Sequence, residues 1–333
     1  MMGATLVIPM QQVKDLLSVE ECVRLQEEVF GLSASGRAWE GASAWARPEV
    51  AAMAHPRSAK MMLGGIEPDW WGIKMIAFSD GDVDAKRRMA IVTLFEAESL
   101  LPAAIIEANY LGYMRTGAAG AVATRHLARP DARVIGVLGS GAVSRFSVDA
   151  HLALGRDVDK ICLFSPSAER AARFAADIRQ RHGVDVETFG TADDVARRAE
   201  ILITGTGAGT PAFDPTVLAP GTHVSAMGHQ GELDPRIFSM ARTIADEKAN
   251  AVAHGKLSTA IAAGAADAEV VAASLGDVIA GARPGRRSES EITLFDSSGL
   301  TFQDIAVGVY LRERVLEREL QQMVEIDTDK AMW

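Results

Sequence analysis

The chain has 333 residues, of which 48% are hydrophobic and 23% charged, and its formal net charge at pH 7 is −10. This length predicts two domains or one large α/β unit, and the acidic balance argues against nucleic-acid binding, which needs a basic surface. Two cysteines are too few for a disulfide framework or a cysteine-based metal site, and no signal peptide or bilayer-spanning apolar run is found. We therefore expect no membrane partner and a cytoplasmic location.

The first third of the chain mixes helix and strand patterns. Apolar spacing predicts a helix over Val13–Phe30, with Ser18 ahead of two glutamates as a candidate cap. Trp70–Phe78 and Met89–Phe95 are short apolar runs typical of strands. Leu100–Arg115 is predicted to begin as a strand or turn and then to become helical.

Strand and helix patterns then alternate with short connections, which predicts a parallel sheet covered by helices on both faces. The expected strands are Val134–Leu138, Lys160–Phe164, Val184–Phe189, Ile201–Thr204 and His223–Ala226, and the expected helices are Gly141–Leu154, Ala168–Arg181 and Ala192–Arg198. The Ala-rich stretch Ala260–Ala273 is predicted as a packed helix or helix pair. A long amphipathic helix from Leu300 to about Gln322 is expected to return to the first part of the chain.

The strongest functional motif is RVIGVLGSGAVS, in which a five-residue apolar strand runs into Gly139-Ser140-Gly141 and a helix follows directly. Gly139 allows a tight turn, Gly141 lets a pyrophosphate approach the backbone, and the helix N-terminus supplies free N–H groups. Ser144 stands where the usual fingerprint has its third glycine. The motif predicts a Rossmann-type site for NAD or NADP, and a plain strand-to-helix turn is the alternative.

The residues after the second strand of this domain bear on the choice of cofactor. A carboxylate there would bind the ribose 2′-hydroxyl and select NAD. The strand instead leads into Ser165-Pro166-Ser167, and Arg170 follows one helical turn later. Two hydroxyls and a cation suit a 2′-phosphate, so the sequence favours NADP over NAD. A second glycine-rich turn, Thr204–Gly209, should lie along the same crevice, either covering the cofactor or as a flexible loop only.

Four stretches carry a resemblance to a known family: NYLGYMRTGAAGAVATRHLAR (109–129), GTHVSAMG (221–228), ELDPRIF (232–238) and TLFDSSGLTFQDIAVG (293–308). In order and spacing, over most of the chain, they resemble the ornithine cyclodeaminase/μ-crystallin family. The resemblance implies an α/β fold with a Rossmann dinucleotide-binding domain over 115–298. It also implies a discontinuous α+β substrate and dimerisation domain over 1–114 and 299–333, and a homodimer.

The resemblance further implies a cluster of cations that grips the α-carboxylate of an amino or imino acid. By position these are Arg57, Lys74 and Arg115, with Arg47 as the alternative to Arg57. An Arg fork binds a carboxylate through two parallel hydrogen bonds, whereas Lys serves as a point charge or proton donor. Each cation taken alone is more often a solvated surface residue. Lys74, however, stands in an apolar strand, where a charge should be functional or paired.

The glycine turn and the resemblance together predict the cofactor contacts. They are Thr116, Gly139, Ser140, Gly141, Ala142, Val143, Ser165, Thr204, Gly205, Thr206, Met227, Gly228 and Ser298. Ser298 lies in FDSSG, which the resemblance puts near the nicotinamide, and Ser297 or Ser298 is also predicted to cap the final helix. Because no metal-ligand spacing occurs, no metal is predicted.

After Met227-Gly228 the chain departs from the cyclodeaminases of this family, which place an aspartate two residues beyond that glycine. Here His229-Gln230 follows, and Gln230 can hydrogen-bond but cannot act as a base. The resemblance therefore implies an NAD(P)H-dependent imino-acid reductase or amino-acid dehydrogenase. Its proton comes from Lys74 or His229, although His229 is equally read as a solvent-facing loop residue. Cyclodeamination with tightly bound NAD and a non-catalytic nucleotide-binding protein are the alternatives.

Overall fold

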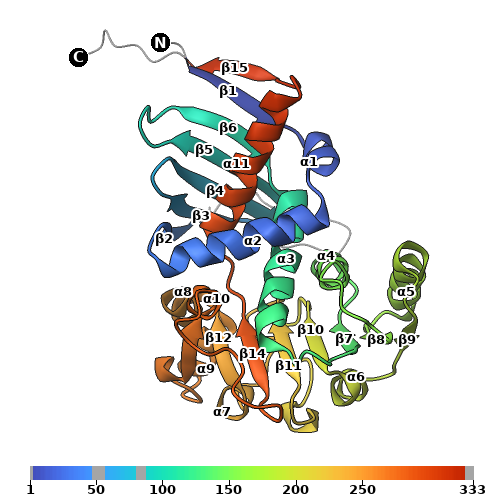
Figure 1. The fold of residues 1–333 in the computed structure, drawn as a ribbon. Helices are drawn as coiled ribbons and strands as arrows, with labels where there is room; N and C mark the ends of the chain where they lie inside the picture. Colours follow the sequence, from blue (N-terminus) through green and yellow to red (C-terminus); the bar gives the residue numbers. More distant parts are fainter. Residues whose placement is uncertain (1–2, 47–56, 80–87, 327–333) are drawn as a thin grey trace. The chain divides into compact units, whose positions relative to one another are not determined.

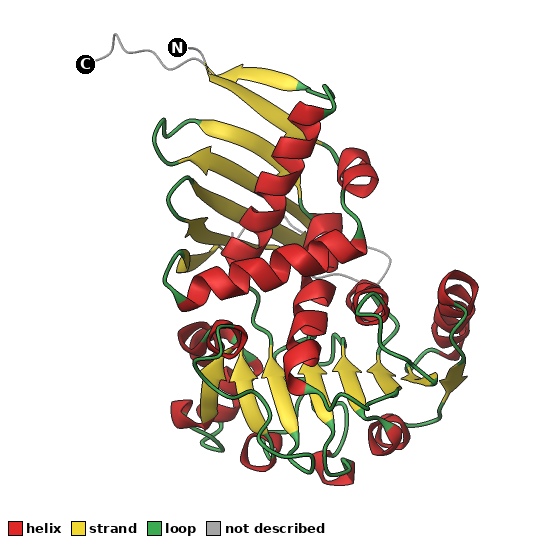
Figure 2. Ribbon diagram, in the orientation of Figure 1, coloured by secondary structure: helices red, strands yellow, loops and turns green. Residues whose placement is uncertain are grey.

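The computed structural model describes residues 3–46, 57–79 and 88–326. The chain divides into two compact units, one of Met1–Arg115 with Leu300–Trp333 and the other of Thr116–Gly299. Figures 1 and 2 show a helix-covered sheet in each unit, which confirms the predicted α/β class with a Rossmann unit. The helices within the described ranges are all too short or too polar to cross a bilayer.

The first unit is built on a seven-stranded mixed sheet. Its strands are β1 (Gly3–Ile8), β2 (Ala38–Ala46), β3 (Arg57–Ile66), β4 (Trp70–Ser79), β5 (Arg88–Glu96), β6 (Pro102–Glu107) and β15 (Met323–Ile326), and its helices are α1 (Met10–Leu16), α2 (Val19–Ala34), the start of α3 (Asn109–Leu127) and α11 (Thr301–Glu317). The strand order is β15-β1-β6-β5-β4-β3-β2. Strands β1 and β6 pair in parallel, and all other neighbours pair antiparallel.

Successive residues of β4 face opposite sides of this sheet, as the two-residue period of a strand requires. Gly72 and Lys74 are buried, and a Cβ added to Gly72 would lie 3.3 Å from Ile305 of α11. This is the face that α11 and α2 cross in Figure 1. Trp71 and Ile73 point to the other face and are only half-buried.

The predicted helix Val13–Phe30 is two helices, so its continuity was predicted wrongly. Helix α1 ends at Leu16, and α2 begins at Val19 after an extended residue, Ser18. The Ser18 Oγ accepts a hydrogen bond from the Glu21 N–H at 3.1 Å, which confirms the predicted cap. Apolar spacing did not reveal the break because both helices bury one face against the same sheet.

The second unit is an eight-stranded sheet with helices on both faces (Figure 2). Its strands are β7 (Val134–Leu138), β8 (Lys160–Phe164), β9 (Val186–Thr188), β10 (Ile201–Thr204), β11 (His223–Ala226), β12 (Arg242–Ala245), β13 (Val271–Ser274) and β14 (Thr293–Asp296). Its helices are the rest of α3, α4 (Ala142–Leu152), α5 (Ala168–His182), α6 (Ala192–Arg198), α7 (Ile237–Met240), α8 (Lys248–His254), α9 (Lys256–Ala262) and α10 (Leu275–Ile279), with 3₁₀ turns η1 (Pro215–Val217) and η2 (Ala268–Val270). The strand order is β13-β12-β14-β11-β10-β7-β8-β9, and every pair is parallel.

Two apolar cores lie on the two faces of this parallel sheet. Leu138 and Leu202 belong to the core that includes α6, whereas Val137 and Ile203 belong to the core that includes α5. Because both faces are covered, the strands read as unbroken apolar runs. Strand β7 pairs with β8, the next strand in the chain, on one side and with β10 on the other side. The carboxyl ends of β7 and β10 therefore form a topological switch point, where open α/β sheets bind ligands.

Small residues let helix α3 pack closely within the second unit. A Cβ on Gly117 would clash with the backbone of Phe146, and a Cβ on Gly120 would lie 2.9 Å from the Ser225 Oγ. The glycines of the RTGAAG motif therefore have a packing role.

Two predicted helices end early. Helix α9 stops at Ala262, and Val271–Ser274 is strand β13, so most of the Ala-rich stretch Ala260–Ala273 is not helical as predicted. Gly264 has φ +69°, a conformation that ends a helix. The final helix, α11, stops at Glu317 rather than near Gln322, and the chain continues into β15.

Candidate functional site

The turn after β7 has the geometry of a diphosphate cradle. Gly139 has φ +100°, and a Cβ there would lie 2.9 Å from the Gly205 carbonyl oxygen. Gly141 is the N-cap of α4 and makes no side-chain capping bond, and a Cβ on it would meet no atom within 4 Å. The first N–H groups of α4 are therefore open to an anion, because nothing on Gly141 covers them.

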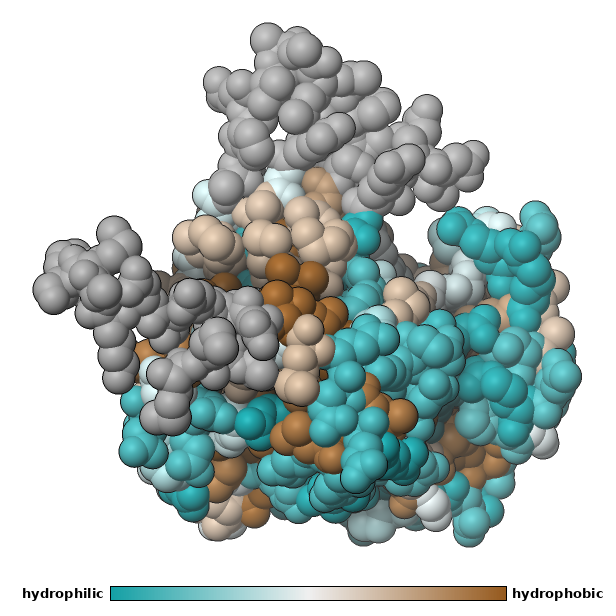
Figure 3. All heavy atoms as spheres, turned by 90° about the horizontal axis from the view of Figure 1, so that it is seen from above, coloured by the Kyte–Doolittle hydropathy of each residue, from teal (hydrophilic) through white to brown (hydrophobic). Residues whose placement is uncertain are grey.

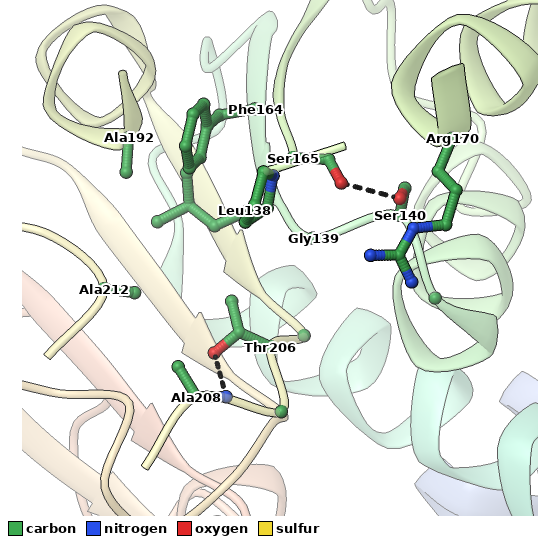
Figure 4. Close-up of a pocket in the computed structure, with 14 residues that line it drawn as sticks. Leu138, Gly139, Ser140, Phe164, Ser165, Arg170, Ala192, Thr206, Ala208 and Ala212 are labelled. Carbon is green, nitrogen blue, oxygen red and sulfur yellow. Dashed lines mark hydrogen bonds between the residues drawn. The ribbon is translucent and has the colours of Figure 1, made fainter. Parts of the chain in front are cut away.

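A cavity of about 500 Å³ opens at this turn, within the usual size range of ligand pockets. It is lined by Leu138, Gly139, Ser140, Gly141, Phe164, Ser165, Pro166, Arg170, Ala192, Gly205, Thr206, Gly207, Ala208 and Ala212. Figure 4 shows Ser140, Ser165 and Thr206 just beyond the ends of β7, β8 and β10, and Arg170 and Ala192 on the helices α5 and α6. The shape and the helix N-terminus fit a dinucleotide.

One end of the cavity is polar and carries a cation. The Ser140 and Ser165 hydroxyls lie 2.8 Å apart, and the exposed Arg170 side chain extends toward Ser140 in Figure 4. Among the described residues that line the cavity, none carries a carboxylate. Two hydroxyls and a guanidinium without an opposing carboxylate can bind a phosphate monoester.

Ser144 takes the place of the third glycine without opening the helix–sheet packing. It is fully buried, and a Cβ on Gly205 would lie 2.5 Å from the Ser144 Oγ. The close approach that the fingerprint normally obtains from a glycine on the helix is obtained here from Gly205 on the facing loop.

A buried carboxylate that the sequence did not single out, Glu232, ties together two loops at the ends of β10 and β11. It accepts hydrogen bonds from the Thr204 hydroxyl (2.7 Å), the Thr206 hydroxyl (2.8 Å) and N–H (3.0 Å), and the Gly228 N–H (2.8 Å). The predicted contact residues Thr204, Thr206 and Gly228 therefore all donate hydrogen bonds to the same carboxylate. Glu232 lies in the ELDPRIF stretch, four residues beyond Gly228, and only its burial distinguishes it from a surface glutamate.

Ser298 does not cap the final helix, so that prediction is wrong for both serines. The N-cap of α11 is Leu300, whose N–H donates a hydrogen bond to the Gln303 Oε1 at 2.8 Å. The Ser298 Oγ instead donates to the buried Asp246 carboxylate at 2.6 Å, and Asp246 also accepts from the Ser298 and Gly299 N–H groups. Burial raises the pKa of Asp246 to about 6.

Six of the predicted cofactor contacts line the cavity and the others lie outside it. Gly139, Ser140, Gly141, Ser165, Gly205 and Thr206 line it. Ala142 and Val143 begin helix α4, Thr116 is half-buried in α3, and Thr204, Met227, Gly228 and Ser298 lie at or just beyond the ends of β10, β11 and β14. As cofactor contacts, all of these remain predictions.

In the first unit, Lys74 of β4 and Arg115 of α3 meet at Asp304 of α11. The Asp304 Oδ1 lies 2.5 Å from the Lys74 Nζ and 3.2 Å from the Arg115 Nε, and Lys74 and Asp304 are fully buried. The sequence expectation that Lys74 is paired or functional is met by this ion pair. We call these three residues the Lys74–Asp304–Arg115 cluster.

Burial and charge set the protonation of this cluster. Burial, with the neighbouring Arg115 charge, lowers the pKa of Lys74 to about 8. Burial alone would raise the pKa of Asp304, but Arg115 and Lys74 outweigh it and hold that pKa below its usual range. The cluster therefore combines two cations and one carboxylate, with one net positive charge when Lys74 is protonated.

The other predicted catalytic residues are Arg57, His229 and Gln230. Arg57 begins β3, but its side chain and the alternative Arg47 lie outside the described residues. His229 is exposed, and its Nδ1 accepts a hydrogen bond from the Gly231 N–H at 3.1 Å. Gln230 is also exposed, and its amide donates to the His254 carbonyl at 2.5 Å. Their catalytic roles remain predictions.

Among the described residues, no three His, Cys, Asp or Glu side chains are grouped to hold a metal ion.

Two curated relatives match this chain over most of its length. The chain is 30% identical to alanine dehydrogenase of Archaeoglobus fulgidus over 327 residues, 96% of this chain and 98% of that protein. It is 32% identical to Delta(1)-pyrroline-2-carboxylate reductase of Bacillus cereus over 262 residues, 76% of this chain and 80% of the relative.

A solved structure of an archaeal alanine dehydrogenase dimer with bound NAD matches with a TM-score of 0.88 and 27% identity. The match covers 97% of this chain and 100% of that one. A sequence profile of one family covers residues 4–319. The chain belongs to the ornithine cyclodeaminase/mu-crystallin family.

Proposed function

We propose that this protein is an NAD(P)H-dependent oxidoreductase that acts on a C–N bond, reducing an α-imino acid to an amino acid or catalysing the reverse oxidation. One observation carries the proposal: a buried lysine and arginine share one carboxylate, which leaves a net positive charge for an acid. The relatives named alanine dehydrogenase and Delta(1)-pyrroline-2-carboxylate reductase support the same reaction class.

The nucleotide would be held at the turn after β7. Gly139 and Gly141 leave room for its diphosphate, and the uncapped start of α4 directs N–H groups to it. Glu232 fixes Thr206 on the opposite wall of the cavity. When bound, the dihydronicotinamide supplies the hydride for reduction.

We further propose that NADP(H) is preferred to NAD(H). Ser140, Ser165 and Arg170 form a phosphate-binding group at one end of the cavity, and the described residues that line it include no carboxylate to repel a 2′-phosphate. The preference follows from charge. A guanidinium adds a charge-assisted bond to a phosphate that a ribose hydroxyl lacks.

The substrate would be held by its α-carboxylate on Arg115 and Lys74, with Arg57 as a further candidate. In the reducing direction the imine carbon accepts the hydride and the imine nitrogen accepts a proton from the Lys74 Nζ. The C=N double bond thereby becomes a C–N single bond, and Lys74 regains its proton from water. Because the pKa of Lys74 is lowered to about 8, the ammonium is a stronger acid than an exposed lysine.

Cyclodeamination is less consistent with this site than reduction is. The position two residues beyond Gly228 is Gln230, which has no basic form at neutral pH, and its amide donates a hydrogen bond to the His254 carbonyl.

The proposed function is tested by a panel assay with purified protein. NADPH oxidation with a cyclic imino acid, or with pyruvate and an amine, is the expected result. Ammonia and proline from ornithine without net cofactor use would establish the lyase, and nucleotide binding without turnover would establish a binding protein.

We infer that the active form is a homodimer. The sheet face opposite Lys74 is apolar, with Met75 of β4 between Met61 of β3 and Ile91 of β5, and Trp71 stacked on Phe95 at 4.3 Å. Met61 is 46% exposed, and Figure 3 shows hydrophobic side chains at the surface among hydrophilic ones. A related archaeal enzyme is a dimer. Analytical ultracentrifugation is expected to give twice the chain mass, and a monomer at all concentrations would refute the inference.

The cytoplasmic location remains a prediction.

A further inference from the structure

We propose that Asp304 is a positioning residue for the reaction: it fixes the Lys74 ammonium and the Arg115 guanidinium in place and keeps Lys74 protonated. The inference rests on the proposed function, since it concerns the same cation cluster. Asp304 lies on α11, whereas Lys74 lies on β4 and Arg115 on α3, so one carboxylate joins three elements of the first unit.

The arrangement around the Asp304 carboxylate is asymmetric. Both cations contact Oδ1, at 2.5 Å from the Lys74 Nζ and 3.2 Å from the Arg115 Nε. Oδ2 is buried and has no hydrogen-bond partner among the described residues. A buried carboxylate that serves stability alone is expected to satisfy both of its oxygens. The unsatisfied oxygen therefore favours a functional role for Asp304.

Without Asp304, the two positive side chains would be buried together without the carboxylate that contacts them both. Arg115 and Arg88 each oppose the charge on Lys74, and Asp304 supports it. Burial alone would raise the pKa of Asp304, but Arg115 and Lys74 favour its ionised form. The pKa of the nearby Glu40 is raised to about 7, chiefly by burial. Once the Asp304 charge is removed, burial, Arg115 and Arg88 still act on Lys74, and each of them favours its neutral form.

A second set of contacts holds Asp304 and Arg115 rigidly. The Gln303 Oε1 accepts from the Arg115 Nη1 at 3.2 Å, and the Gln303 amide donates to the Gln26 Oε1 at 3.0 Å. The Gln26 amide in turn donates to the Gln303 carbonyl at 3.2 Å. Glu40 of β2 accepts from the Thr301 hydroxyl at 2.7 Å at the start of the same helix. The first turn of α11 is thus anchored from two other elements, so Asp304 is a fixed point for both cations.

The test compares Asp304→Asn with the wild type by two readouts. The first is the pKa of Lys74, followed by NMR of protein labelled with ¹³C at lysine Cε and assigned with Lys74→Met. The Lys74 pKa is expected to fall by about 1–3 units in Asp304→Asn, because the supporting charge is lost. The second is the pH profile of kcat and KM for the imino acid. Its alkaline limb should move to lower pH by the same amount, with a rise in KM as Arg115 loses its anchor.

Controls separate this role from a structural one. Asp149→Asn removes a carboxylate that is also buried, is ion-paired with Arg181 at 2.7 Å and lies 2.8 Å from the His182 Nε2, and it should leave the Lys74 pKa unchanged. Asp304→Glu should restore part of the shift, and it serves as the second variant if Asp304→Asn does not fold. A Lys74 pKa equal to that of the wild type in folded Asp304→Asn would overturn the inference. Absence of turnover in the wild type would instead refute the proposed function.

Discussion

Lys74 and Asp304 are 230 positions apart in the chain, yet the Lys74 Nζ and the Asp304 Oδ1 lie 2.5 Å apart and both side chains are fully buried. The pair joins the central part of the first sheet to the helix that returns from the end of the chain. Burying an ammonium is costly unless it is paired, so its position in an apolar strand has a chemical reason. That reason, in our account, is to hold an acid and to deliver a proton.

Lys74→Ala is expected to abolish turnover while leaving nucleotide affinity nearly unchanged. A positioned general acid contributes about 10²–10⁴-fold to a rate, so kcat should fall by that range. Absorbance of NADPH at saturating substrate measures kcat, and fluorescence titration measures nucleotide affinity. Normal turnover in folded Lys74→Ala would exclude the assigned role.

The rate of imine reduction is expected to fall as pH rises through about 8. The pKa of Lys74 is lowered to about 8, chiefly by burial, so the side chain is protonated below that pH and neutral above it. Reduction needs the protonated form, whereas oxidation of the amino acid needs the neutral form and should become faster as pH rises. The check is a pair of pH profiles of kcat/KM, one in each direction. Two profiles with the same slope above pH 8 would contradict the assignment.

Gly139→Ala is expected to weaken nucleotide binding. Its φ of +100° is unfavourable for alanine, and the added Cβ would press on the Gly205 carbonyl oxygen beside the cavity. Strain of about 1–3 kcal/mol would raise Kd by about 5- to 150-fold if it distorts the turn. Gly155→Ala is the matched control, because Gly155 also has positive φ, +71°, but its Cβ would meet no atom within 4 Å. Equal loss of affinity in both variants would mean that the turn itself is not the site.

Ser165→Asp combined with Arg170→Ala is expected to reverse the coenzyme preference from NADPH to NADH. The new carboxylate can bind ribose hydroxyls and repels a 2′-phosphate, while the lost guanidinium removes a charge-assisted bond. The NADPH Kd should rise by about tenfold or more. Arg173→Ala, which removes an exposed cation further along α5, should change neither affinity. If the double variant kept its NADPH affinity, the proposed phosphate group would be wrong.

The sequence predicted what depends on local patterns and missed what depends on distant partners. The alternation of apolar strands and helices, with the Gly139–Gly141 turn, was sufficient for the Rossmann unit, because each element has its own signal. Strand β13 was missed because alanine favours helices, while the parallel partner β12 that makes Val271–Ser274 a strand lies more than 20 residues earlier in the chain.

The candidate site shows the same limit. Lys74 stood out as a charge in an apolar strand, but its partner could not be chosen among the many acidic residues from local patterns alone. Asp304 becomes visible as that partner only once α11 is packed on β4. Serine is a residue type that often caps helices, yet the Ser298 hydroxyl donates a hydrogen bond to Asp246 at the end of β12. Caps are predicted from neighbours in the chain, and here the competing acceptor comes from a different strand.

The most direct test of the central claim is to follow the hydride. Purified protein would be supplied with an α-imino acid and NADPH carrying deuterium at C4 of the nicotinamide, in each stereoisomer separately. The amino acid product would then be analysed by mass spectrometry and NMR. We predict one deuterium at the α-carbon from one stereoisomer, with one NADPH consumed for each amino acid formed. Product without deuterium at the α-carbon from either stereoisomer would contradict the account.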